Sequence, residues 1–305
     1  MSRDAERVMR AFDEYLKAHG NQISDNQSLN QLARQFTEEY NDLLQDHEPE
    51  SAEDYLALSN EAPSKSAALR YAKKALSLEP DNLDAASAVA QLEAQDDVAL
   101  LDKLSALIEK GNRQMERENH FKESMGDFWM VLETRPYMRL RYDYMQTLIR
   151  CGMYRQAILE GRQLMELCKE DNLGVRFDLI HLYAHLDDLE PALALKDSHP
   201  VNEDDGQFLM ALAALYFKRG ALDESLACLK KLCAVNRDAK RFLQLVHKEE
   251  ADSLFESTDE MSYRPYTIEE LGHEYFTYLY LFENIQPFFD WAYRKLRNYK
   301  VKRCV

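Results

Sequence analysis

Two histidines on one predicted helix have the spacing of a pair of metal ligands. His181 and His185 stand four residues apart in HLYAH, so both imidazoles would lie on the same helix face. The segment lacks the glutamate of a zinc-protease helix, and neither nearby cysteine belongs to a zinc-type pair. Two ligands alone seldom define a metal site. We therefore expect no metal and no other cofactor, and we expect these histidines in a groove or on the surface.

The five cysteines are potential nucleophiles, but the sequence gives none of them a catalytic base. They are widely spread and include no CxxC pair; they are Cys151, Cys168, Cys228, Cys233 and Cys304. Cys228 and Cys233 stand five residues apart on a predicted helix and therefore face different directions. We expect all five to be free thiols in a reducing compartment.

Motifs for chemistry at a phosphate, a dinucleotide or an ester are also missing from the sequence. It contains no GxxxxGK[ST], no GxGxxG and no GxSxG. The acidic pairs Asp187-Asp188 and Asp204-Asp205 fit turns and solvated charge better than paired acid and base catalysts. We therefore expect a protein that is not an enzyme and that has no small-molecule substrate.

The elements that would position these residues are helices. Leu, Ala, Glu, Lys and Gln dominate a chain of 305 residues that has only 9 glycines and 8 prolines, which favours helix nearly throughout. The formal net charge of −16 argues against attraction of the whole molecule to nucleic acid or anionic membranes. The longest apolar run, FLMALAALYF, has about half of the roughly 20 residues that cross a bilayer. With no secretory leader expected, the sequence predicts a cytoplasmic protein without a membrane span.

A turn followed by a small residue recurs along the chain. In residues 67–85, Pro80 stops one helix and Asp81-Asn82 cap the next, while alanines occupy one face of the first helix. The later turn residues are Gly152, Asp187 and Gly220, and the small residues that follow them are Ala157, Ala192 and Ser225. These small residues are 35 and 33 positions apart, close to the repeat length of about 34 residues in tetratricopeptide arrays.

This pattern resembles the tetratricopeptide-repeat family. The resemblance implies an all-α fold, a right-handed α-α superhelix built from antiparallel helix hairpins. Residues 1–47 would form an N-terminal helical cap, 48–248 the repeats, 249–262 an acidic linker and 263–305 aromatic-rich capping helices. The segment 81–122 fits the repeat poorly and would hold a degenerate or lengthened pair. The aromatic end is either a cap that closes the core or a surface that binds a partner.

The basic and aromatic residues after Pro136 follow one face of a predicted helix. Pro136 fits the first turn of that helix, with Thr134 or Arg135 as the cap. From Arg139 onward, a stripe with three-and-four spacing would line the inner groove of a tetratricopeptide array. The same register applies to the first helix of each of the next two predicted hairpins. The predicted groove residues are then Arg139, Tyr142, Gln146, Arg150, Phe177, His181, His185 and Lys218.

A basic, aromatic groove on an acidic protein suits a peptide that carries carboxylates. We therefore expect a non-enzymatic scaffold or adaptor that binds a protein or peptide in this groove. The alternative is a peptide-sensing transcriptional regulator, because SLNQLARQF at 28–36 resembles the first helix of a DNA-reading helix-turn-helix. The acidic FTEEYNDLLQDHE follows in place of a glycine turn and a basic helix, so we do not expect nucleic acid as the partner.

A narrower resemblance rests on ETRPYMRLRYDY, CGMYRQAI and DNLGVR. These segments resemble the core of the suppressor-of-tumorigenicity-seven family and its bacterial tetratricopeptide relatives, over residues 128–176. The resemblance implies a helical repeat without established enzymatic activity. It also implies that Arg135, Asn172 and Arg176 belong, with Arg139, to a family pattern. The membrane-spanning segments of the animal members are not found here, so their location is not carried over.

Overall fold

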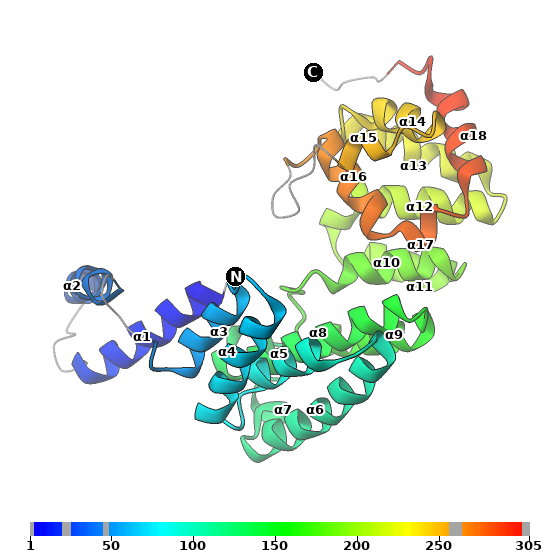
Figure 1. Cartoon of the computed structure of the whole chain (residues 1–305). Helices are drawn as coiled ribbons and strands as arrows, with labels where there is room; N and C mark the ends of the chain where they lie inside the picture. Colours follow the sequence, from blue (N-terminus) through cyan, green and yellow to red (C-terminus); the bar gives the residue numbers. More distant parts are fainter. Residues whose placement is uncertain (1–2, 20–25, 45–48, 256–263, 301–305) are drawn as a thin grey trace. The chain divides into compact units, whose positions relative to one another are not determined.

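The protein is an all-helical molecule. Its structure, a computed structural model, describes residues 3–19, 26–44, 49–255 and 264–300. These residues form α-helices joined by turns and short 3-10 segments, and no strand is present among them, which confirms the predicted all-α class (Figure 1). The chain divides into two compact units, Met1–Asn172 and Leu173–Val305, and each is described by itself.

Unit 1 contains the first nine helices. They are α1 (Arg3–His19), α2 (Asn26–Leu44), α3 (Ala52–Asn60), α4 (Lys65–Leu78), α5 (Leu83–Glu93), α6 (Asp97–Arg117), α7 (His120–Glu123), α8 (Arg135–Arg150) and α9 (Tyr154–Leu167). Two 3-10 segments, Phe128–Met130 and Leu132–Thr134, lead into α8. The predicted irregular segment 81–122 holds α5 and the 21-residue helix α6, so its hairpin is a lengthened one.

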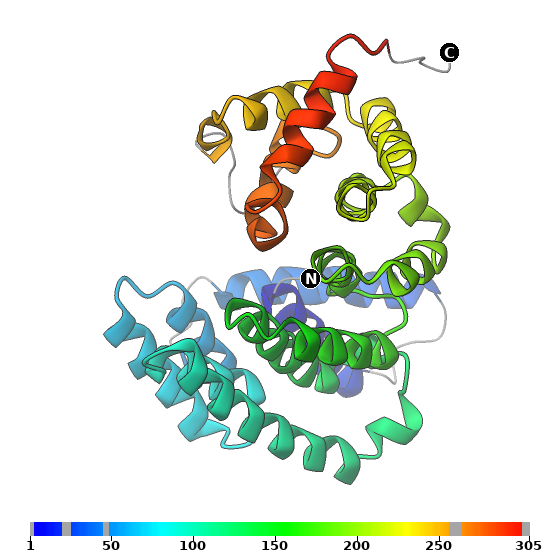
Figure 2. The same ribbon diagram turned by 90° about the vertical axis from the view of Figure 1, so that its right-hand side faces the viewer.

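Small residues allow the helices of unit 1 to pack closely. Ala72 and Ala75 of α4 and Ala85 of α5 are 0% exposed. Helix α4 lies against α3 and α5, and α8 lies against α6 and α9 (Figure 2). Helix α5 also contacts α3 and α8 directly. The first helices of these hairpins, α3, α5 and α8, therefore share a surface, which we call the first-helix face of unit 1.

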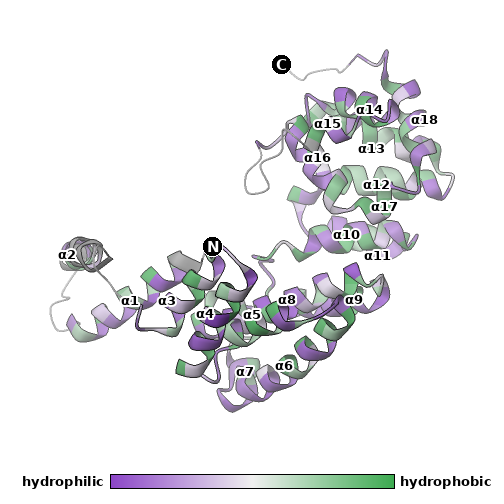
Figure 3. Cartoon of the chain, in the orientation of Figure 1, coloured by the Kyte–Doolittle hydropathy of each residue, from purple (hydrophilic) through white to green (hydrophobic). Residues whose placement is uncertain are grey.

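Unit 2 contains the remaining helices. They are α10 (Val175–His185), α11 (Leu189–Asp197), α12 (Gly206–Lys218), α13 (Leu222–Val235), α14 (Ala239–His247), α15 (Asp252–Phe255), α16 (Ile268–Thr277), α17 (Leu279–Phe282) and α18 (Gln286–Leu296). Helix α12 is the most apolar, and its residues 208–215 are all buried (Figure 3). Across the described residues, no helix combines the length and the apolar character that a membrane span requires.

The aromatic C-terminal segment packs into unit 2. Helix α16 contacts α12 and α14, α17 contacts α10, and α18 lies against α13 and α14. Phe282, Phe288 and Phe289 are at most 1% exposed. These aromatic side chains thus form part of the interior of the unit. The predicted acidic linker begins before α15, and its part from 256 to 262 lies outside the described residues.

The hairpin turns have the geometry that the sequence pattern predicts. The predicted turn residues have positive φ angles, 70° at Gly152, 61° at Asp187 and 76° at Gly220. After each of them, a backbone N–H donates to a carbonyl five residues earlier, from Met153 to Leu148, from Asp188 to Tyr183 and from Ala221 to Tyr216. The predicted small residues Ala157, Ala192 and Ser225 are all 0% exposed. The predicted turn positions are thus confirmed, and the small residues after them are buried.

Side-chain caps fix where the helices of unit 1 begin. Asn82 Oδ1 accepts a hydrogen bond of 2.9 Å from the Ala85 N–H, as the sequence predicts. At α3, Ser51 Oγ accepts from the Asp54 N–H at 3.1 Å and Asp54 Oδ2 accepts from the Ser51 N–H at 3.0 Å, which forms a capping box. The predicted start of α8 is also confirmed, because its N-cap is Thr134 and its first turn carries the proline.

The N-terminal helices pair with each other through aromatic side chains. The ring centroids of Phe12 and Tyr15 in α1 lie 5.0 and 5.4 Å from that of Phe36 in α2. The segment 28–42 lies within the single helix α2, so the turn that a helix-turn-helix would need is not formed there.

The turn glycines give a first prediction. Gly220 has a φ of 76° and open space where a Cβ would lie, whereas Gly206 begins α12 without a positive φ, and its nearest neighbour would lie 3.8 Å from a Cβ. We expect Gly220→Ala to lower the free energy of unfolding by about 1–2 kcal/mol, because an L-residue is disfavoured in the left-handed region. Gly206→Ala, the matched control, should cause no loss. Urea unfolding followed by circular dichroism measures both, and equal stability of the two variants would contradict the prediction.

Candidate functional site

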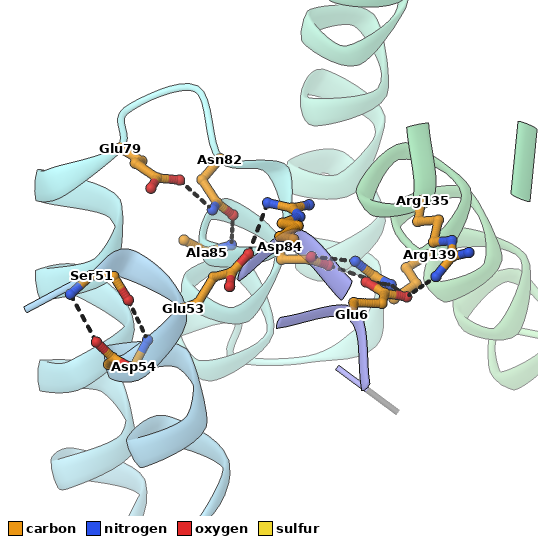
Figure 4. Close-up of polar contacts among 11 residues, drawn as sticks. Glu6, Ser51, Glu53, Asp54, Glu79, Asn82, Asp84, Ala85, Arg135 and Arg139 are labelled. Carbon is orange, nitrogen blue, oxygen red and sulfur yellow. Dashed lines mark hydrogen bonds and ion pairs between the residues drawn. The ribbon is translucent and has the colours of Figure 1, made fainter. Parts of the chain in front are cut away.

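The guanidinium of Arg139 connects three helices of unit 1. Its Nε and Nη2 donate to Asp84 Oδ1 and Oδ2 at 2.9 and 2.6 Å, so the contact with α5 is bidentate. Its Nη1 donates to both carboxylate oxygens of Glu6 in α1, at 2.8 and 2.9 Å. Figure 4 shows Arg139 between these two carboxylates. The residue therefore joins α8, α5 and α1 at one point on the first-helix face.

Arg135 brings a second cation to the same carboxylate. It is 3% exposed, and its Nη1 lies 3.3 Å from Glu6 Oε1. Its Nε donates to the Trp129 carbonyl at 2.7 Å, and its guanidinium lies 5.3 Å from the centroid of the Trp129 ring. Burial alone would lower the pKa of Arg139, but the hydrogen bonds and charges of Asp84 and Glu6 raise it. Arg139 therefore remains cationic, and Glu6, which is 4% exposed, lies beside two guanidinium groups.

Two further ion pairs attach α1 to α3. Arg7 Nη1 lies 3.2 Å from Asp54 Oδ1, and Arg10 Nη1 lies 2.8 Å from Glu53 Oε1. Burial would raise the pKa of Asp54, but the hydrogen bonds from Ser51 and Glu50 and the charge of Arg7 lower it to about 2. Burial raises the pKa of Glu53, against the opposing charge of Arg10. Helix α1 thus lies on the first-helix face through charges that alternate in sign.

A pocket of about 630 Å³ lies beside α1 on this face. It is bounded by residues of α1, α3, the turn before α5, α6 and α8. Carboxylates outnumber arginines in its lining, and Glu79, Glu118 and Glu133 are among them. Gln114 contributes a buried Oε1 that has no hydrogen-bond partner among the described residues. The pocket can therefore accept a side chain that donates hydrogen bonds.

The remaining predicted groove residues of α8 lie further along the helix. Arg150 is exposed, and its Nη2 donates to Asp97 Oδ1 at 2.9 Å and to Thr147 Oγ1 at 3.0 Å. Gln146 is partly buried, with an Nε2 that lacks a hydrogen-bond partner among the described residues. Tyr142 is also partly buried. The structure thus puts Arg139 in a closed ion-pair network and Arg150 in a separate, solvent-exposed pair.

The predicted groove residues of unit 2 contact neighbouring elements of that unit. The Phe177 ring packs against Phe208 with centroids 6.0 Å apart. Lys218 Nζ donates to the carbonyls of Ala184 and His185 at 2.9 and 2.6 Å, which satisfies the C-terminal end of α10. The His185 ring lies edge-on to Tyr280, with centroids 5.3 Å apart.

His181 lies inside unit 2 beside a buried carboxyl group. It is 0% exposed, and its ring stacks on Tyr278 with centroids 3.5 Å apart. Nδ1 lies 2.7 Å from the Phe177 carbonyl oxygen, an acceptor only, so Nδ1 carries a proton. Nε2 lies 3.1 Å from Glu274 Oε1. In its neutral form the ring accepts at Nε2, and this contact then requires a protonated Glu274 as the donor.

The pKa shifts agree with a neutral pair. Burial lowers the pKa of His181 to about 3. Burial, with the charges of Asp205 and Glu270, raises the pKa of Glu274 well above its ordinary range. One proton therefore occupies the Glu274 carboxyl group, in addition to the one on Nδ1.

The three predicted family-motif residues have different surroundings. Arg135 belongs to the ion-pair network described above. Asn172 is exposed, and its Oδ1 accepts a hydrogen bond from the Cys168 thiol at 3.2 Å. The Arg176 guanidinium lies over the Phe177 ring, 4.2 Å from its centroid. Arg135 and Asn172 belong to unit 1, and Arg176 belongs to unit 2.

Four acidic partners of the arginines on this face were not predicted from the sequence: Glu6, Glu53, Asp54 and Asp84. The sequence pointed only weakly to Asp84 as a partner of an arginine, because an acidic residue in the first turn of a helix is already favoured by the helix dipole. Glu6 had none, because it is 133 residues away from Arg139 in the chain.

Among the described residues, no group of His, Cys, Asp and Glu has the arrangement of a metal site. Burial raises the pKa of Cys233 to about 11, which keeps this thiol protonated at neutral pH.

The two arginines of α8 allow a paired test of the ion-pair network. Asp84 and Asp97 both lie in the first turn of a helix and both pair with an arginine of α8. The Asp84 side chain is 10% exposed, whereas that of Asp97 is 42% exposed. We expect Asp84→Asn to cost about 1.5–3 kcal/mol of unfolding free energy, as for a buried hydrogen bond to a charge. Asp97→Asn should cost less than about 1 kcal/mol, as for an exposed ion pair. Urea unfolding measures both, and similar losses would count against the network.

The His181 and Glu274 pair makes stability depend on pH in two directions. In the folded protein the two side chains together hold one titrating proton, on Glu274. In the unfolded chain they hold none above the ordinary histidine pKa of 6.5, one between pH 6.5 and 4.5, and two below the ordinary glutamate pKa of 4.5. The contribution of the pair to the unfolding free energy is therefore greatest between about pH 4.5 and 6.5, and it decreases on either side.

Glu274→Gln tests this pH dependence. Its amide still donates to His181 Nε2 but cannot lose a proton, so the decrease above pH 6.5 should vanish, and stability should instead begin to fall below about pH 6.5. The measurement is urea unfolding of both chains from pH 4 to 9. If the difference in unfolding free energy between Glu274→Gln and the unaltered chain were the same at every pH, the assignment of the proton to Glu274 would be wrong.

Comparison with known proteins adds no family to this description. No protein-family model and no curated protein matches the chain. The established description is therefore an all-helical protein, and its function has to be argued from the contacts of its own residues.

Proposed function

We propose that the protein is a non-enzymatic scaffold that binds a segment of another protein on the first-helix face of unit 1. One observation carries the proposal: this face already holds a helix, α1, through ion pairs with α3 and α8 and a shared arginine contact with α5. A surface that binds one helix through side-chain charges has the chemistry to bind another.

The chemistry of the face indicates what a partner would offer. Arg139 and Arg135 both contact the carboxylate of Glu6, so a partner carboxylate would find two donors in a nearly buried position. This supports a protein or peptide partner with acidic groups. Tyr142 and Gln146 follow Arg139 on α8 at three- and four-residue spacing and would continue its face for a longer segment.

We also propose that the helix hairpins are tetratricopeptide-like. The spacing of 35 and 33 residues between Ala157, Ala192 and Ser225, and the common turn geometry before them, support tetratricopeptide-like hairpins that wind into a right-handed superhelix. The resemblance to the suppressor-of-tumorigenicity-seven family rests on ETRPYMRLRYDY, CGMYRQAI and DNLGVR, within residues 128–176. We propose a cytoplasmic location because the chain has free thiols and an acidic composition.

The unit 2 residues of the predicted groove do not enter this proposal. His181 is fully buried, and Phe177, His185 and Lys218 make intramolecular contacts of their own. The regulator alternative receives no support from α2, because one continuous helix offers no recognition helix to a DNA groove.

Arg139 and Arg150 give a matched test of the proposal. A tagged full chain is used to purify bound proteins from the source cell, with Arg139→Gln and Arg150→Gln variants in parallel. We expect Arg139→Gln to reduce partner recovery at least about tenfold, since a charge-assisted bidentate contact is worth more than about 1.4 kcal/mol, and Arg150→Gln to leave most of it.

Circular dichroism must first show equal helix content in the three chains. Equal recovery of the same proteins by Arg139→Gln and by the unaltered chain would refute binding at this face.

A further inference from the structure

We infer that the partner presents a helix with the charge order of α1, an acidic residue followed by basic residues one and four positions later, and that it binds by displacing α1. The inference rests on the proposed function and names the class of partner for the same face. The occupant that the structure shows there is α1, with Glu6, Arg7 and Arg10 as its contact residues.

The charge order of α1 matches the face residue by residue. Successive helix residues are about 100° apart, so positions 6, 7 and 10 fall within an arc of about 100° on one side of α1. The acidic position meets Arg139 and Arg135 (Figure 4), and the two basic positions meet Asp54 and Glu53. A helix with the opposite order would bring like charges together at all three positions, so the face selects by repulsion as well as by attraction.

Helix α1 is attached in a way that permits exchange. Its aromatic residues Phe12 and Tyr15 pack on Phe36 of α2, away from the first-helix face. On that face α1 is held by the Glu6 side chain, which is 5% exposed, and by Arg7 and Arg10, whose side chains are 27% and 37% exposed. Partly exposed ion pairs exchange readily with water and weaken as salt is added.

A partner can also gain contacts that α1 leaves unmade. The pocket of about 630 Å³ borders Glu6, Arg7 and Arg10 on one side and α5, α6 and α8 on the other. Gln114 Oε1 lies in its lining without a hydrogen-bond partner among the described residues. A longer side chain with a donor at its end would fill this space. The partner would then bind more tightly than α1 at equal charge.

The experiment uses a labelled synthetic peptide with the sequence of residues 3–19, RDAERVMRAFDEYLKAH. The control peptide has the same apolar residues and carries Glu6→Lys, Arg7→Glu and Arg10→Glu. Each peptide is titrated by fluorescence polarisation against the unaltered full chain and against a full chain that carries the same three changes in its own α1. These changes detach α1 and leave α3, α5 and α8 intact.

We expect the native-sequence peptide to bind the altered chain at least about tenfold more tightly than the unaltered chain, because the unaltered chain must first release its own α1. Higher salt should weaken this binding. Equal affinity for both chains would overturn displacement. Equal affinity of both peptides for the altered chain would overturn the charge order.

A charge exchange across the interface tests the pairing of positions 10 and 53 by a gain of binding, which a misfolded triple variant could not give. Glu53→Arg in the altered chain should reject the native-sequence peptide and accept the peptide that carries Arg10→Glu alone. Rejection of both peptides would overturn the pairing of these positions. If the peptide results are negative while the Arg139→Gln chain still loses its cellular partners, the charge order fails and the scaffold proposal stands. If recovery by that chain is also unchanged, both fail.

Discussion

The first-helix face of unit 1 depends on the electrostatic balance around the guanidinium of Arg139. A buried cation is tolerated only when acceptors surround it, and here Asp84 supplies a bidentate contact from α5 while Glu6 supplies a second carboxylate from α1. Arg135 then offsets the excess negative charge, held in place by the Trp129 carbonyl and ring. One planar group thus links three helices at this point.

In each unit a further segment covers the first helices of the hairpins, and the two covering segments differ in the kind of contact they make. In unit 1 the cover is α1, which makes charged contacts of moderate exposure. In unit 2 the cover is the aromatic segment of α16 and α17, with Phe282 and Tyr278 packed in the interior. Apolar burial on that scale is difficult to reverse without unfolding, whereas ion pairs can be replaced by those of another molecule. This contrast is why we assign binding to unit 1.

The sequence was sufficient for the local features and insufficient for the long-range ones. Gly152, Pro136 and Asn82 could be assigned to turns and helix starts because backbone geometry acts over a few residues. The stripe from Arg139 to Arg150 was placed on one face of a real helix for the same reason. Its intramolecular partners were not predictable, since Glu6 comes from a helix at the other end of unit 1. His181 was expected in a groove, but helix periodicity does not reveal that a distant segment covers that side.

The separation of Glu6 and Arg139 by 133 residues has a consequence for synthesis of the chain. A ribosome adds roughly 5–20 residues per second, so α1 emerges about 7–27 s before Arg139 exists to pair with it. During that interval α1 can already pair with α2 through Phe12 and Phe36, which are close in sequence. The N-terminal hairpin can thus form early, and its Arg7 and Arg10 can pair with Asp54 and Glu53 soon after α3 has been made. The contact of Glu6 with Arg139 is then the last of these ion pairs to be completed during synthesis.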